Sequence, residues 1–190
     1  MLTDSLPKKA LLRAAYLRSD QLCILEVPAD DRLRAPARSI EEALNAEQSA
    51  PVRKACLEFL TAAAAFYGVS RPQIRVLAAR PLKVREGGGA TELFGDYQFE
   101  NMLIRVWVRT AVQKRVTSFG TFLSTLCHEF CHHLDCERFG FRDTPHTRGF
   151  YERAAALYHH ARSTPAKRLF WAPLPNGRWS IDWPRTNRGG

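Results

Sequence analysis

The sequence predicts an α+β fold in which a small three-stranded sheet packs against one long helix, with further helices on its flanks. Segments with the apolar period of a helix lie on both sides of three short segments that are typical of strands. The 190 residues are enough for one domain with short extensions, and a content of 45% hydrophobic and 25% charged residues is ordinary for a globular protein. We therefore expect one compact core.

Two helices are predicted before the sheet. Ser39 and Glu42 have the spacing of a capping box, so we expect a helix to begin at Ser39. A second helix is predicted over residues 51–67, because proline suits the first helical position and Gly68 can adopt the left-handed conformation that ends a helix. We interpret residues 1–48 as a helical extension that precedes the central domain.

Three strands are predicted next. The segment QIRVLAA (73–79) lies between two prolines. After a glycine-rich loop at 87–89, the segments ATELFGDY (90–97) and NMLIRVWV (101–108) are expected to form a hairpin closed around residues 98–101. One face of the last strand is apolar. The other face, with Arg105, Trp107 and Arg109, is either solvated or a surface on which a substrate or nucleic acid lies.

Two more helices are predicted after the sheet. The first is expected over residues 118–139 and is ended by Gly140, and the second is expected over 145–160 with Thr144 as its N-cap. The central domain would then span residues 49–160. Residues 161–190 are rich in Pro, Arg and Trp and have no sustained period, so we expect an irregular extension.

The long helix contains the sequence His128-Glu129-Phe130-Cys131-His132, an HExxH motif. Successive helical residues are about 100° apart, so His128 and His132 lie on one side of the helix and can bind one metal ion. Glu129 lies beside them without being a ligand. A zinc ion in such a site lowers the pKa of a water molecule towards about 7, and the carboxylate can take its proton. The motif therefore indicates a metal-assisted hydrolase.

A catalytic zinc site also needs a third protein ligand. His146 is one candidate, at the start of the next predicted helix. Glu152 is the other, because the segment Glu-Arg-Ala-Ala resembles the ExxA sequence that supplies a glutamate ligand in gluzincin proteases. On the residues alone, both stay open.

Neighbouring polar residues receive other interpretations. His133 lies about 100° beyond His132 around the helix and should miss the metal. Asp135 is either a surface acid or a group that orients a ligand imidazole. Arg148 and Tyr151 are the nearest candidates for a group that stabilises an oxyanion.

The order of elements resembles that of the SprT-like zinc metallopeptidases, which include the Spartan-type proteases, and more loosely that of the WLM-type proteases. The features that carry the resemblance are a helix, three strands, the HExxH helix, a short loop and a His-x-x-x-Phe sequence, over roughly residues 50–160. The resemblance implies a mini-gluzincin fold, Glu129 as the general base and Phe150 as a buried aromatic residue. It favours His146 over Glu152. The zinc (Zn²⁺) ligands that it implies are His128, His132 and His146.

The formal net charge of +9 is unevenly distributed. Residues 161–190 contain one acid, Asp182, beside the basic residues Arg162, Lys167, Arg168, Arg178, Arg185 and Arg188. Three tryptophans lie among these cations, and such a segment can bind nucleic acid, anchor itself on the domain or cover a cleft. These three alternatives stay open.

The sequence also indicates where the protein works. It has no apolar run of about 18 residues and no pattern of a signal peptide, so we expect an intracellular, cytoplasmic protein with no membrane partner. It would be associated with the nucleoid if its basic segment binds DNA. Free thiols in a reducing compartment are favoured by the odd number of cysteines, which are Cys23, Cys56, Cys127, Cys131 and Cys136.

These patterns together predict a zinc-dependent endopeptidase with a protein or peptide substrate. We expect the peptide to lie extended along the strand at 102–108. The family resemblance suggests DNA-associated or DNA-crosslinked proteins as substrates. The alternative is a non-catalytic, zinc-containing protein that binds nucleic acid or acts as a scaffold.

Overall fold

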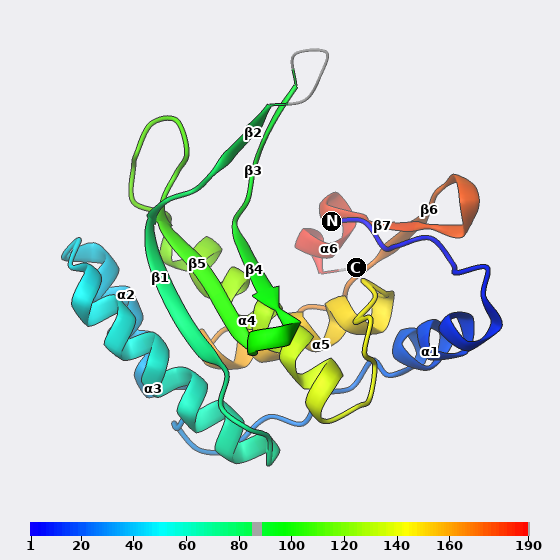
Figure 1. The fold of residues 1–190 in the computed structure, drawn as a ribbon, viewed down its shortest axis with the longest axis horizontal. Coiled ribbons are helices and arrows are strands. Elements are labelled where there is room, and N and C mark those ends of the chain that lie inside the picture. Colours follow the sequence, from blue (N-terminus) through cyan, green and yellow to red (C-terminus); the bar gives the residue numbers. More distant parts are fainter. Residues whose placement is uncertain (85–88, 190) are drawn as a thin grey trace.

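The computed structural model describes residues 1–84 and 89–189 (Figure 1). The helices are α1 (Ala10–Gln21), α2 (Arg34–Asn45), α3 (Ser49–Tyr67), α4 (Phe119–Glu137), α5 (Arg148–Ala161) and α6 (Trp183–Arg188). The strands are β1 (Gln73–Ala79), β2 (Leu82–Val84), β3 (Ala90–Glu92), β4 (Gly95–Gln98), β5 (Leu103–Arg109), β6 (Trp171–Pro173) and β7 (Trp179–Ile181). This is the predicted α+β class. Among the described helices, none has the length and apolarity needed to cross a bilayer.

A three-stranded sheet of order β1-β5-β4 forms the centre of the fold. β1 runs parallel to β5, and β4 runs antiparallel to it. The predicted hairpin is β4 and β5, which are joined through a 3-10 helix at Phe99–Asn101. Side chains of α2, α3, α4 and α5 share one apolar core with Ile104, Val106 and Val108 of β5. The helix that carries the HExxH motif therefore lies against the sheet.

The predicted role of the strand at 102–108 is wrong. β5 is the central strand and is paired on both edges, so a peptide cannot extend the sheet there. Its basic side chains are also engaged, because Arg105 pairs with Asp96 of β4 and Arg109 pairs with Glu47. Alternation of apolar and charged residues indicates a strand with one buried face, but it does not distinguish a central strand from an edge strand.

The strand predicted at 90–97 is divided into two. β3 pairs with β2 in an arm that projects from the sheet, whereas β4 belongs to the sheet itself (Figure 1). Arg80, which follows β1, contacts the last residue of β3 and a residue between β3 and β4. Its Nη1 atom lies 3.0 Å from Glu92 Oε2, and its guanidinium stacks 3.8 Å from the ring centroid of Phe94. Of the predicted glycine loop at 87–89, residues 87 and 88 lie outside the described residues.

The predicted capping box at Ser39 is also wrong, because α2 begins five residues earlier, at Arg34. The Ser39 hydroxyl lies inside the helix and donates to the carbonyl oxygen of Ala35. Pro36 lies in the first turn, where a missing amide hydrogen costs nothing. The apolar stripe of α2 already includes Ala37, so packing favours the longer helix.

The other helix ends follow their signals more closely. α3 ends at Tyr67, and Gly68 has the expected left-handed conformation with φ of 65°. α4 begins after Ser118, whose hydroxyl accepts from the amide of Thr121. α4 ends at Glu137, two residues before the predicted end.

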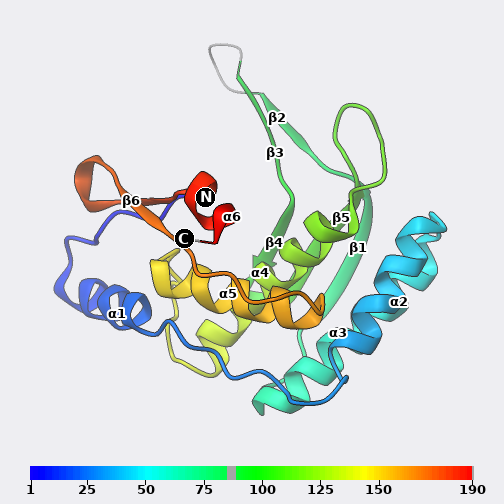
Figure 2. The same cartoon turned by 180° about the vertical axis from the view of Figure 1, so that it is seen from behind.

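The described part of the segment at 161–190, residues 161–189, contains regular elements rather than being irregular, which corrects the prediction. β6 and β7 form a hairpin, and α6 follows it. Residues 1–4 lie beside β7, where the amide of Thr3 donates to the carbonyl of Trp179 (2.9 Å) (Figures 1 and 2). Strands of three residues give no periodic signal, and pairing with the other end of the chain is not visible in a local pattern.

A buried ion pair joins three helices. The side chains of Arg153 on α5 and Asp135 on α4 are 1% and 0% exposed, and Arg153 Nη2 lies 2.7 Å from Asp135 Oδ1. The same guanidinium donates to the carbonyl oxygens of Ser19 and Leu22 at the end of α1. At Gly149, a Cβ atom would overlap the carbonyl oxygen of Ser19, so the end of α1 packs directly on the backbone of α5.

We predict that Arg153→Met lowers the free energy of unfolding by about 3–5 kcal/mol, because it leaves the buried Asp135 carboxylate without its partner. Urea denaturation measures this change. Arg162→Met removes an exposed arginine from the end of the same helix and should change the free energy by less than about 0.5 kcal/mol. Equal effects of the two substitutions would show that the buried pair does not join the helices.

Candidate metal centre

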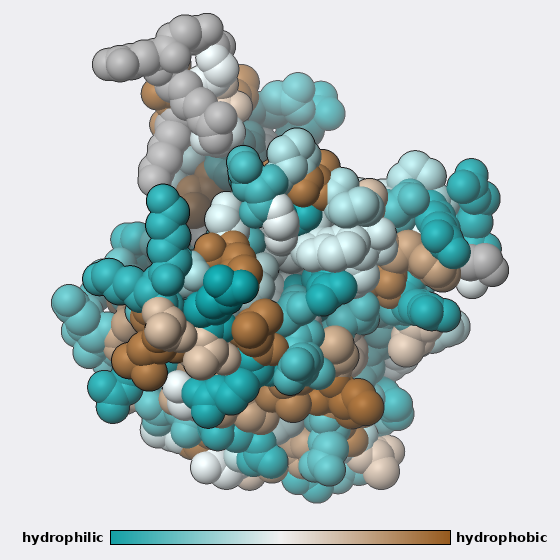
Figure 3. Space-filling model, turned by 90° about the vertical axis from the view of Figure 1, so that its right-hand side faces the viewer, coloured by the Kyte–Doolittle hydropathy of each residue, from teal (hydrophilic) through white to brown (hydrophobic). Residues whose placement is uncertain are grey.

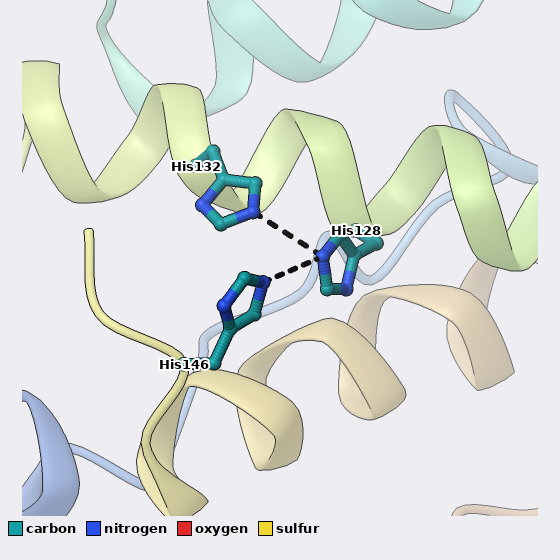
Figure 4. Close-up of side chains that lie close together, drawn as sticks. All are labelled: His128, His132 and His146. Atoms are coloured by element: carbon teal, nitrogen blue, oxygen red, sulfur yellow. Dashed lines mark hydrogen bonds between the residues drawn. The ribbon is translucent and has the colours of Figure 1, made fainter. Parts of the chain in front are cut away.

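Three histidines converge between α4 and α5. His128 and His132 lie one turn apart on α4, and His146 comes from the loop that precedes α5 (Figure 4). The Nε2 atom of His128 lies 3.1 Å from that of His146 and 3.2 Å from that of His132. The structure thus brings together the two motif histidines and the candidate third ligand, in a group that could hold a metal ion.

The geometry of this group fits a tetrahedral metal ion such as zinc. Zinc–nitrogen bonds of about 2.0–2.1 Å place neighbouring ligand atoms roughly 3.3 Å apart in a tetrahedron. The observed nitrogen–nitrogen distances of 3.1 and 3.2 Å are close to this spacing. An imidazole with its proton on Nδ1 presents a lone pair at Nε2, and several lone pairs that face one another are favourable only around a cation.

Groups behind the ring nitrogens favour this proton placement. His132 Nδ1 lies 2.6 Å from Thr144 Oγ1, and His146 Nδ1 lies 3.5 Å from Asp4 Oδ2. Outer hydrogen bonds of this kind fix the orientation of a ligand imidazole. Thr144 is therefore not the N-cap of α5 as predicted. That role belongs to Thr147, whose hydroxyl accepts from the amide of Phe150 (3.0 Å).

Burial keeps the motif histidines neutral. It lowers the pKa of His128 to about 3, with a smaller contribution from His146, and it holds the pKa of His132 well below its usual value. Neutral imidazoles are the form that binds metals. Phe150 is fully buried, and its ring centroid lies 4.5–5.1 Å from those of the three imidazoles. It packs against all three rings.

Glu129 lies next to this group in an apolar environment. It is 6% exposed, and burial raises the pKa of its carboxyl to about 8, with a smaller contribution from the charge of Asp96. Gly95 of β4 packs against it so closely that a Cβ atom there would lie 2.9 Å from Glu129 Oε1. The edge strand β4 therefore lies directly on the carboxylate.

His128, alone among the three clustered histidines, lines a cleft of about 1430 Å³, and Glu129 lines it as well. The segment from Glu92 to Gly95 forms one wall. The opposite wall comes from the C-terminal segment and includes Trp183. The floor consists of small and polar residues of α4 and α5, among them Gly120, Ser124, Thr125, Ala154 and Ala155. The cleft has the size of an extended peptide of several residues rather than of one small molecule.

The polar groups of three residues considered from the sequence contact partners other than the three clustered histidines. Glu152, the competing third ligand, accepts a hydrogen bond from Trp171 Nε1 (3.2 Å). Arg148 forms an ion pair with Asp20. The Tyr151 hydroxyl donates to the carbonyl oxygen of Leu2 (2.9 Å), although its ring stacks on His146. The polar groups of both oxyanion candidates are thus engaged away from the histidines.

Other polar residues of α4 have structural contacts. His133 is fully buried and contacts the Tyr97 hydroxyl (2.9 Å) and the carbonyl oxygen of Ser70 (2.7 Å), so it joins α4 to β4 and to the loop before β1. The thiols of Cys127 and Cys131 are buried and free, and burial raises their pKa values. They lie outside the metal-binding group found among the described residues.

Sequence reasoning missed two residues of this region. Asp4 is 142 positions from His146, and nothing in the local sequence marks it as a neighbour of a ligand. In the sequence, Gly95 indicates only an interruption of a strand. Its close approach to Glu129 depends on how β4 packs on α4.

We predict a pH-dependent effect of Glu129→Gln on the stability of the metal-free protein. Between pH 4.5 and about 8 the folded protein keeps the Glu129 proton while the unfolded chain loses it, so the free energy of unfolding of the original protein falls as pH rises. Glutamine carries no such proton, so the stability of the variant relative to the original should rise across this window.

Denaturant titrations from pH 4 to 9 measure this difference. Glu58→Gln, on the exposed side of α3, controls for the loss of a carboxylate. A difference between Glu129→Gln and the original protein that stays constant with pH would contradict a buried, protonated Glu129.

A comparison of the chain with family models, with curated proteins and with solved structures finds no match.

Proposed function

We propose that this protein is a zinc-dependent endopeptidase with a SprT-like, mini-gluzincin arrangement of its helices and strands. One observation carries the proposal: three imidazole Nε2 atoms converge beside a buried glutamate, and His128 and this glutamate line a large cleft. The set of His128, His132 and His146 leaves one position of a tetrahedral ion free. A site that serves only structure is usually closed by a fourth protein ligand.

The residues of the chain have distinct roles in this proposal. Zinc held by the three histidines supplies Lewis acidity, which activates water and polarises a peptide carbonyl. The Glu129 carboxylate takes a proton from the attacking water and delivers it to the nitrogen of the leaving amine. Burial keeps Glu129 protonated in the metal-free protein, but a zinc ion held by the three histidines would lower the pKa of Glu129 and restore the carboxylate that acts as a base.

The substrate path follows β4 rather than β5. Among the described strands β4 pairs only with β5, which leaves its outer edge available to an extended peptide. β4 also lies directly on Glu129 through Gly95. A peptide paired with this edge would run through the cleft and place its backbone next to the general base.

A second function, nucleic-acid binding, is favoured by the charges of the C-terminal segment. Five of its cations are exposed, and none of them belongs to an ion pair within the described residues: Arg162, Lys167, Arg168, Arg185 and Arg188. Figure 3 shows hydrophilic side chains interspersed with apolar ones on the side of the molecule that is at the right in Figure 1. Trp171 donates a hydrogen bond to Glu152, and Trp179 packs under Arg148. These two rings therefore hold the C-terminal segment against α5. A protease with this segment could act on DNA-associated or DNA-crosslinked proteins.

We predict that the purified protein binds one zinc ion and cleaves a denatured model protein, and that Glu129→Gln retains the zinc while it lowers the cleavage rate at least about 100-fold. Metal analysis and a gel-based cleavage assay measure the two effects. Glu152→Gln is the matched control, because it replaces the alternative ligand and should preserve both zinc and cleavage. Removal of zinc with a chelator should abolish cleavage, and added zinc should restore it.

Two results would contradict the proposal. One is a purified protein without zinc that also fails to take it up. The other is unchanged cleavage by Glu129→Gln. Loss of zinc in Glu152→Gln together with its retention in His146→Ala would instead assign the third ligand to Glu152.

We predict that the C-terminal cations bind single-stranded DNA. Replacement of four of them by glutamine should weaken binding and reduce the dependence of log K on log salt by about 0.7 for each phosphate that the protein no longer neutralises. The variant carries Lys167→Gln, Arg168→Gln, Arg185→Gln and Arg188→Gln. A control with the same reduction of charge at exposed positions outside this segment carries Arg13→Gln, Arg53→Gln, Lys54→Gln and Arg71→Gln. Equal weakening in both would show that net charge, rather than this segment, attracts the DNA.

A further inference from the structure

The first four residues of the chain lie against the loop that carries His146. The amide of Asp4 donates to the carbonyl oxygen of His146 (2.8 Å), and the amide of His146 donates to Asp4 Oδ2 (2.8 Å). The same carboxylate oxygen lies 3.5 Å from His146 Nδ1. Asp4 thus contacts both the backbone and the ring of the candidate third ligand.

Asp4 is itself held in place from several sides. The Tyr16 hydroxyl donates to its carbonyl oxygen (3.0 Å). The preceding residue, Thr3, is fully buried, and its hydroxyl and carbonyl oxygens accept from the Trp179 amide (2.8 Å) and from Arg178 Nε (2.9 Å). The position of the carboxylate therefore does not depend on a free chain end.

Of the three histidines, His146 is the one whose position is least fixed by its own secondary structure. His128 and His132 are fixed by the backbone of α4, a long helix in the core, whereas His146 precedes the first residue of α5. Its Nε2 atom faces the other two rings, and its Nδ1 atom faces Asp4. A carboxylate behind a ligand imidazole fixes the tautomer and ring orientation, and it makes the ligand nitrogen more basic.

We propose that Asp4 is a positioning residue for the metal site, which holds His146 with its Nε2 lone pair directed at the ion. This inference rests on the proposed metal centre but not on peptidase activity. Asp4 lies outside the segment of roughly residues 50–160 that resembles SprT-like proteases, so the first residues of this chain would complete its metal centre.

The test compares the zinc affinity of the full-length protein with that of Asp4→Asn, by competition with a chromophoric chelator. Asparagine keeps an oxygen for the His146 amide but removes the charge behind the ring, and we expect zinc binding to weaken about 10–100-fold. Asp30→Asn is the matched control, because it removes an exposed carboxylate that pairs only with its neighbour Arg32. Its zinc affinity should equal that of the original protein.

Cobalt(II) provides a readout that a merely structural role would not change. If Asp4 orients His146, the visible absorption bands of the cobalt-loaded protein should shift in Asp4→Asn, whereas partial unfolding would lower the loaded fraction without changing the bands. Asp4→Glu keeps the charge and should recover part of the affinity, which also covers the case in which Asp4→Asn folds poorly.

The outcomes separate this inference from the proposed function. Zinc affinity of Asp4→Asn within twofold of the original, unchanged cobalt bands, or an Asp4→Glu variant as weak as Asp4→Asn would overturn the positioning role and leave the metal centre intact. A protein that binds neither metal through its histidines would overturn the proposed function itself.

Discussion

The convergence of three imidazoles on one point is the constraint on which the rest of this structure depends. Their Nε2 lone pairs face one another, so packing must hold the rings together and outer hydrogen bonds must hold the protons on the far side. α4 lies buried against the sheet and supplies two of the rings, and Phe150 on α5 packs against all three. The buried pair of Arg153 and Asp135 ties α5 to α4 and to α1, and therefore keeps the loop with His146 opposite the HExxH helix.

Segments near both ends of the chain lie at the candidate site. Residues 1–4 pair with β7, and from there Asp4 reaches the His146 loop. The C-terminal segment lines the cleft with Trp183, which is 42% exposed, and with the exposed cations Arg162 and Lys167. Part of the positive charge of the protein therefore lies at the cleft. The chemistry at the histidines follows from burial and ligand geometry.

Local patterns in the sequence were sufficient to predict several helix ends and the placement of two histidines on one side of α4. The spacing of His128 and His132 is a property of any α-helix, and Gly68 ends α3 because a left-handed residue is needed there. Contacts between distant segments were not predictable: whether β5 is central or at an edge depends on β1, which precedes it by some thirty residues. Thr144 has the chemistry of an N-cap, yet its backbone has a positive φ and its hydroxyl contacts His132. No local pattern identified Asp4, because its contact with His146 forms only when residues 1–4 pack beside β7 in the folded protein.

The ligand set of the bound metal tests the central claim most directly. X-ray absorption spectroscopy of the zinc-loaded protein distinguishes sulfur from nitrogen or oxygen ligands, identifies imidazole rings by their multiple scattering and measures the ligand distances. We expect three imidazole nitrogens at about 2.0–2.1 Å and one further non-sulfur ligand, with the imidazole signal reduced by one ring in His146→Ala. Sulfur at about 2.3 Å, or two imidazoles with a carboxylate that disappears in Glu152→Ala, would contradict a centre built from His128, His132 and His146.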